Sequence, residues 1–108
     1  MALYLTQVTY TPEAWQTMIA TPTDRSKMLA KACKSHGGKL IGLWFSMGEQ
    51  DVVTITEFPD AVSAATLLIA VAAGGSVAAS KSTQLLSVAE AMEAMAKAGS
   101  SGYKPVGS

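Results

Sequence analysis

Residues 39–60 read KLIGLWFSMGEQDVVTITEFPD, and this stretch decides the fold. Two runs rich in β-branched and aromatic residues, Lys39–Met47 and Val52–Phe58, flank the turn-forming residues Gly48–Asp51. A connection this short cannot carry a crossover, so the pattern predicts an antiparallel hairpin. Directly after the second run, Pro59 and Asp60 are suited to begin a helix, with the aspartate as its cap.

The segments on either side of the hairpin supply the rest of the fold. Before it, Thr11 is suited to cap a helix, and Pro22 separates that helix from the next, because a residue before proline avoids helical angles. After it, Ser87 and Glu90 have the spacing of a capping box. The expected elements are strands over Leu3–Tyr10 and Ser76–Leu86, and helices over Pro12–Ala20, from Thr23 or Asp24 to His36, over Ala61–Ala73, and from Ser87 up to Gly99.

This order of elements predicts an α+β domain of the ferredoxin-like βαββαβ type, with a four-stranded antiparallel sheet and an extra C-terminal helix. Right-handed crossovers place the helices that connect the strands on one face of the sheet. We expect one domain over residues 1–98, followed by a Gly/Ser-rich tail over residues 99–108.

The pattern on the hairpin strands predicts that both faces of the sheet are covered. Strict alternation puts Trp44 on one face and its neighbours Leu43 and Phe45, which we expect to point outward, on the other, so both faces carry apolar groups. A sheet with one solvated face would be polar on that side, and a second copy of the chain is therefore the expected cover. The helix over Ala61–Ala73 is apolar nearly all round and also calls for cover on more than one side.

Two other helices show a single apolar or semi-apolar side, which we expect to be buried in the last helix. In the second helix that side comprises Met28, Leu29, Ala32, Cys33 and His36, and in the last helix it comprises Val88, Met92, Met95 and Ala96.

Composition argues against several kinds of partner. Eight basic residues balance eight acidic ones, so no net charge attracts nucleic acid. The apolar stretch Ala64–Ala73 is short of the roughly 20 residues that a membrane-spanning helix needs. Met1–Tyr10 lacks the pattern of a signal peptide, and the single Cys33 has no partner for an internal disulfide. We therefore expect a cytoplasmic protein with neither nucleic acid nor membrane as partner.

Five short motifs follow one another along Ala2–Leu86: Tyr4–Thr11, Arg25, His36–Leu40, Met47–Val53 and Glu57–Asp60. In this order they resemble the GYD domain family, within the dimeric α+β barrel superfamily. The resemblance implies a dimer of sheets with small pockets and does not imply a reaction. The family is named for a Gly-x-Tyr-Asp motif, and this chain carries Gln50 at the place of the tyrosine.

One residue, His36, is the candidate for acid–base catalysis, because imidazole is the group that proteins use most often for proton transfer. The alternative is a structural role at the end of a helix, where the dipole favours a cation. For binding, we expect Tyr10 and Trp44 as apolar walls, with polar groups of the strands between them. The polar candidates are Gln7 and Thr54 on strands and Gln50 and Asp51 at the hairpin, where Asp51 also has a structural alternative as an acceptor for local backbone N–H groups of the turn.

Metal and cofactor chemistry find no support in the residue pattern. One histidine and one cysteine leave no recognisable set of metal ligands. The pairs Gly37-Gly38 and Gly74-Gly75 end helices, whereas a phosphate-binding loop places its glycines before one. The expected function is a homodimer that holds a small, largely apolar molecule between sheet and helices, with turnover by His36 as an option. The alternative is an assembly module that packs through Ala61–Ala73 and binds no ligand.

Overall fold

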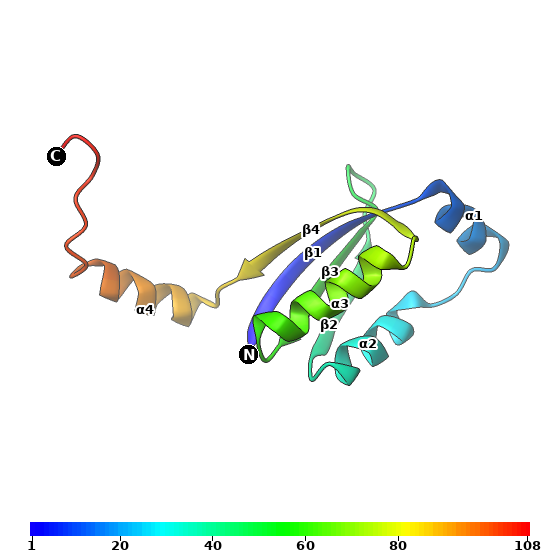
Figure 1. The fold of residues 1–108 in the computed structure, drawn as a ribbon, viewed down its shortest axis with the longest axis horizontal. Helices are drawn as coiled ribbons and strands as arrows, with labels where there is room; N and C mark the ends of the chain where they lie inside the picture. Colours follow the sequence, from blue (N-terminus) through cyan, green and yellow to red (C-terminus); the bar gives the residue numbers. More distant parts are fainter.

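The computed structural model describes residues 1–108 as one four-stranded sheet with four helices (Figure 1). The strand order is β2-β3-β1-β4, and all neighbouring strands are antiparallel. This arrangement confirms the predicted α+β, ferredoxin-like fold. The elements are β1 (Ala2–Tyr10), α1 (Pro12–Ala20), α2 (Arg25–Ser35), β2 (Lys39–Phe45), β3 (Val52–Phe58), α3 (Ala61–Ala73), β4 (Val77–Leu85) and α4 (Val88–Ala98).

Each helix begins at a side-chain cap that the sequence predicts. The Asp60 carboxylate accepts the backbone N–H of Ser63 at 2.7 Å, and this hydrogen bond lowers the pKa of the carboxyl. Ser87 and Glu90 bond reciprocally as a capping box at the start of α4, which likewise lowers the pKa of the glutamate. Caps at Thr11 and Asp24 start α1 and α2. The helix boundaries therefore follow from local hydrogen bonding.

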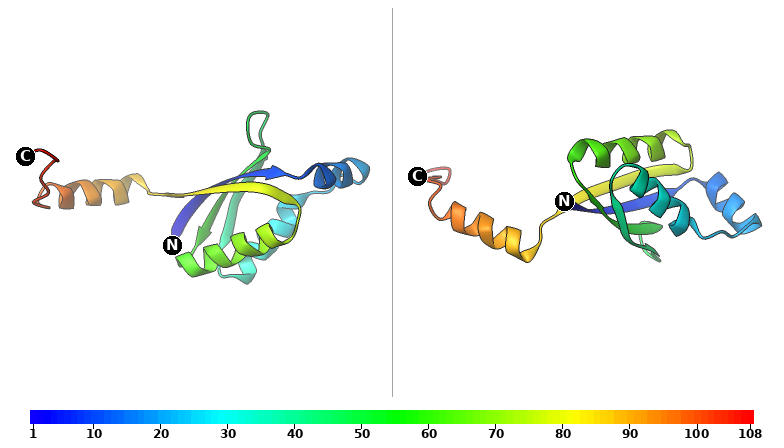
Figure 2. Two further views of the ribbon diagram at one scale, coloured as in Figure 1. Left: turned by 45° about the horizontal axis from the view of Figure 1, so that its top comes forward. Right: turned by 90° about the horizontal axis from the view of Figure 1, so that it is seen from below.

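Helices α2 and α3 cover the same face of the sheet, as the prediction requires, and the opposite face is open (Figure 2). The core lies between these two layers. It is centred on Cys33, which is fully buried, and on Phe58, which is 3% exposed, together with Ala64 and Leu67. Along β3 the residues that face the helices are all buried, and those that face the open side are half-buried.

The glycine pair after α2 is required by two different constraints. Gly37 has φ +76°, a left-handed conformation that other residues adopt at a cost. At Gly38 a Cβ atom would lie 2.5 Å from the ring of Phe58 and 2.6 Å from the carbonyl oxygen of Glu57. Because the second of these is backbone, it cannot move aside cheaply. The pair therefore brings β2 against the end of β3 and the core.

Strand β2 departs from strict alternation, because its pairing with β3 skips Ile41. This bulge places Leu43 opposite Thr54, on the face covered by the helices, and Phe45 lies on that face too. The expectation that Leu43 and Phe45 share a face opposite Trp44 holds, but the idea that they form the outward set is wrong. Instead, Trp44 lies on the open face, where it pairs with Val53 of β3.

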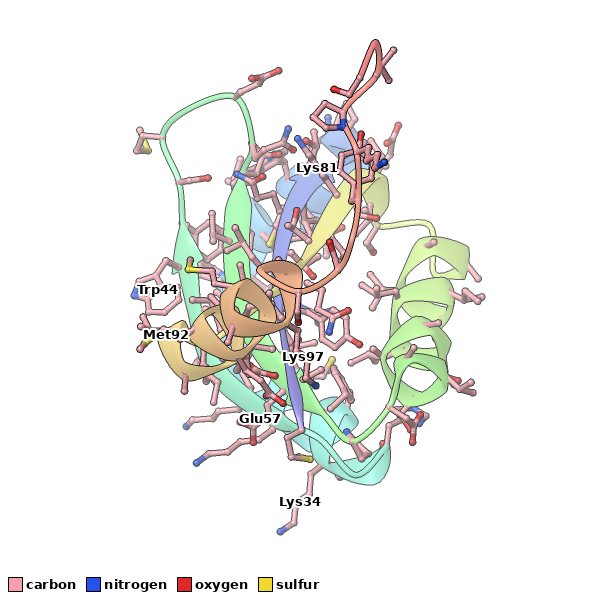
Figure 3. The ribbon with its side chains drawn as sticks, turned by 90° about the vertical axis from the view of Figure 1, so that its left-hand side faces the viewer. Lys34, Trp44, Glu57, Lys81, Met92 and Lys97 are labelled. Carbon is pink, nitrogen blue, oxygen red and sulfur yellow. The ribbon has the colours of Figure 1, made fainter.

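The predicted burial of one side of α4 is wrong for this chain alone. Figure 1 shows α4 beyond the end of β4, projecting away from the sheet, and Figure 3 looks along this arm towards the sheet. Val88 is 78% exposed, and Met92 and Met95 are exposed as well. The amphipathic pattern identifies the apolar side correctly but does not say what covers it. On the polar side, the expected ion pair joins Glu93 and Lys97 at 3.1 Å.

Candidate functional site

A cavity of about 400 Å³ lies between the helix-covered face of the sheet and helices α2 and α3. Its lining is mostly hydrophobic, with a few polar side chains, and its volume falls within the roughly 300–1,000 Å³ that is typical of small-molecule sites. Its floor includes Thr6, Thr54 and Thr56 of β1 and β3, and its walls include Leu29 of α2 and Leu68 and Val71 of α3.

Buried threonines form the polar part of the floor. Thr6 shares a hydrogen bond of 2.8 Å with the hydroxyl of Ser82. Thr54 donates to the backbone oxygen of Thr6 at 3.5 Å, the long end of the range for a hydrogen bond. Thr56 is 6% exposed and makes no side-chain hydrogen bond, yet no polar side-chain atom of the chain is both fully enclosed and unpaired. The Thr56 hydroxyl is therefore open to the cavity that it lines.

Where β1 ends, the rim of the cavity carries an aromatic side chain, Tyr10, and a cation, Arg25. Tyr10 packs edge-on against Trp15, with ring centroids 5.5 Å apart. Burial raises the pKa of the Tyr10 phenol, an effect that the nearby Arg25 partly offsets and Asp51 reinforces. The phenol therefore stays protonated at neutral pH and is able to donate a hydrogen bond.

A family model described as the GYD domain matches residues 4–95 of the 108-residue chain. The chain belongs to the GYD domain family. The match covers every residue that lines the cavity and most of α4, and it confirms the family that the short motifs predict. A comparison with curated proteins finds no match.

In this GYD domain Gln50 and Asp51 of the signature region form hydrogen bonds beside the rim of the cavity, and we call these contacts the clamp. The Asp51 carboxylate accepts the backbone N–H of Tyr10 at 2.9 Å and the indole N–H of Trp15 at 3.3 Å. Gln50, which stands in place of the family tyrosine, accepts a hydrogen bond from the Thr9 hydroxyl at 2.7 Å. These contacts tie the hairpin to the end of β1 and the start of α1. Asp51 thus has a structural role, but its donors come from distant segments of the chain and not from the turn, where the sequence alternative placed them.

The other binding candidates divide between the two faces of the sheet. Tyr10 and Thr54 line the cavity, as the binding hypothesis requires. Trp44 and Gln7 lie on the open face, where Gln7 pairs with Val53 of β3, and neither lines the cavity. Figure 3 shows Trp44 at the margin of the sheet.

His36 lies at the other end of the domain from the clamp. It is the C-cap of α2, where its backbone N–H bonds to the oxygen of Cys33 at 3.1 Å. The length of β3, about 20 Å at the usual rise per residue, separates this end from Asp51. His36 does not line the cavity. The candidate acid–base residue and the candidate binding residues therefore do not share one site.

The structure adds two site residues that the sequence did not single out as ligands, Arg25 and Thr6. Thr56 lines the cavity beside Thr54, with which it shares a face of β3. No group of three or more His, Cys, Asp or Glu side chains lies close enough together to hold a metal ion. None of the helices combines the length and the apolar character needed to cross a membrane.

Proposed function

We propose that this GYD domain is a homodimeric binding protein that holds a small, largely apolar molecule in the cavity between its sheet and helices. The observation that carries the proposal is the cavity itself, about 400 Å³ with the Thr56 hydroxyl open on its floor. A concave space of this size is suited to hold a small-molecule occupant. The mainly hydrophobic walls favour an apolar one.

The proposal is for binding and does not include turnover. The titratable groups on the cavity wall are two tyrosines, Tyr4 and Tyr10, and Arg25. None of these is a general base near neutral pH, and the pKa of Tyr10 is raised further by burial. His36, the group that would suit such chemistry, lies outside the cavity.

The open face of the sheet supports the dimer. Its centre is apolar, with Leu5 opposite Ile55 on neighbouring strands, and Trp44 is 53% exposed at its edge. No helix of the same chain covers this face (Figure 2). Removing apolar surface of this kind from water stabilises the associated state. A second copy placed face to face would cover both open faces at once.

The free thiol of Cys33 suits a cytoplasmic protein. It is the only cysteine and is fully buried, and burial raises its pKa, so the reactive thiolate is suppressed. A single protected thiol is compatible with a reducing compartment, and we place the proposed binding protein there.

One observation favours the second candidate function, an assembly module without a ligand. The side of α3 that faces away from the sheet exposes Val62 and Ile69. Exposed aliphatic residues on one helix side are a feature of surfaces that pack against another subunit. A decisive experiment therefore needs to separate the inner side of α3 from its outer side.

Two adjacent residues of α3, Leu68 and Ile69, lie on its inner and outer sides and allow the two sides to be tested separately. Leu68 lines the cavity, whereas Ile69 is exposed on the outer side of α3. We expect 2-naphthamide, a neutral apolar test ligand, to raise the melting temperature of the wild-type protein, with about 2.7 kcal/mol of stabilisation at a hundredfold excess over Kd. Leu68→Trp should weaken binding at least about tenfold by filling the cavity, roughly 1.4 kcal/mol. Ile69→Trp should leave it unchanged.

Thermal melts and isothermal titration calorimetry on the three proteins check this expectation. Absence of binding to the wild-type protein, or equal binding to both variants, would contradict the proposed cavity site. If Ile69→Trp instead alters the oligomeric state while no protein binds the test ligand, the assembly function is the correct one.

A further inference from the structure

Arg25 is the single charged residue on the wall of the cavity. It is the first residue of α2, beside the cap Asp24, and its guanidinium donates to the sulfur of Met28 at 3.2 Å. No carboxylate lies within 4 Å of it, since the chain's ion pair joins two residues of α4. A guanidinium at the rim of an apolar cavity without an acidic partner is suited to bind an anion that comes from outside.

The charges around the rim favour such an anion. The N-terminus of α2 adds a partial positive charge, and the C-terminus of α3, at Gly74, adds a partial negative charge of similar size, about half a unit. These two partial charges nearly cancel, so the full positive charge of Arg25 decides the sign of the charge at the rim. The acids near Arg25 have other partners or lie to one side: Asp51 is held by Tyr10 and Trp15, Asp24 is held by the backbone N–H and hydroxyl of Ser26, and Glu13 lies in an adjoining hollow that Arg25 also lines.

We infer that the molecule held in the cavity is a monocarboxylate, with an apolar body among the leucines of α2 and α3 and its carboxylate on Arg25 at the rim. This inference rests on the proposed binding function and names the chemical class of the ligand. Tyr10, whose phenol is protonated at neutral pH, lies on the same rim and supplies a second donor. One cation matches the single charge of a carboxylate, whereas a phosphate monoester carries nearly two at neutral pH.

A matched pair of test ligands separates the charge from the apolar body. 2-Naphthoate and 2-naphthamide have nearly the same shape, and only the first is an anion at neutral pH. We expect the wild-type protein to bind the carboxylate about tenfold more tightly than the amide, a difference of ~1.4 kcal/mol. In Arg25→Gln the ratio should fall to about one, with the affinity for the amide unchanged. Isothermal titration calorimetry at low salt measures both affinities.

Lys27→Gln is the control, because it removes the same charge from the same helix at a position that does not line the cavity. It should keep the preference for the carboxylate, and Leu68→Trp should weaken both ligands together. Equal binding of the two ligands by the wild-type protein would overturn the inference and leave the cavity site intact. Binding of neither ligand would overturn both. Loss of amide binding in Arg25→Gln would also overturn the inference, because Arg25 would then shape the cavity instead of holding an anion.

Discussion

Replacing Phe58 by alanine is expected to lower the free energy of unfolding by about 3–5 kcal/mol. The ring is 3% exposed and packs with Cys33 and Leu67 between β3 and the two covering helices. It also meets Tyr4 edge-on, with ring centroids 6.3 Å apart. Small domains are stable by only about 5–15 kcal/mol, so this one truncation should remove a large share of the total. Urea unfolding followed by circular dichroism measures the loss.

Phe45→Ala is the matched control, because Phe45 is the chain's other phenylalanine and is 54% exposed. It should cost about 1 kcal/mol, the usual size for a single substitution. Equal losses for the two variants would show that the core is not centred where Cys33 and Phe58 meet. So would a loss below about 1 kcal/mol for Phe58→Ala.

Ile55→Lys is expected to convert the proposed dimer into a monomer. Ile55 lies at the centre of the open face, with Leu5 and Gly42 as its neighbours across β1 and β2. A lysine there would place an unpaired charge from each copy in the interface, and an uncompensated buried charge costs about 3–5 kcal/mol. The dimer Kd should therefore rise at least about a hundredfold, which corresponds to ~2.7 kcal/mol. Sedimentation equilibrium over a range of concentrations measures the change.

Val62→Lys provides the comparison for the dimer, because Val62 is exposed on the outer side of α3. It should leave the dimer unaltered. A wild-type monomer would contradict the proposed dimer. A dimer that withstands Ile55→Lys but not Val62→Lys would move the interface from the sheet to α3 and favour the assembly function.

The features that the sequence predicted correctly are those with a local cause. Helix starts at Asp60 and Ser87 depend on hydrogen bonds within three residues, so their positions follow from residue types alone. The hairpin follows from Gly48–Asp51, which is too short for any other connection. Together with the order of the elements, these local signals were sufficient for the fold, and the resemblance of the five short motifs was sufficient for the family.

The features that the sequence did not predict depend on contacts between distant segments. The bulge at Ile41 reversed the assignment of β2 side chains to the two faces, because one extra residue exchanges every face beyond it. Arg25 lines the cavity because α2 begins beside Tyr10, and no spacing along the chain predicts that proximity. The apolar side of α4 was identified correctly, but no element of the chain's own fold covers it.

Amide chemical-shift mapping with 2-naphthamide tests the cavity site most directly, because it shows where on the domain the ligand binds. The account predicts saturable shifts that are largest around Thr54 and Thr56 on the floor and Val71 on the wall of the cavity. Shifts confined to Leu5 and Ile55 on the open face, or no saturable shifts at all, would contradict it.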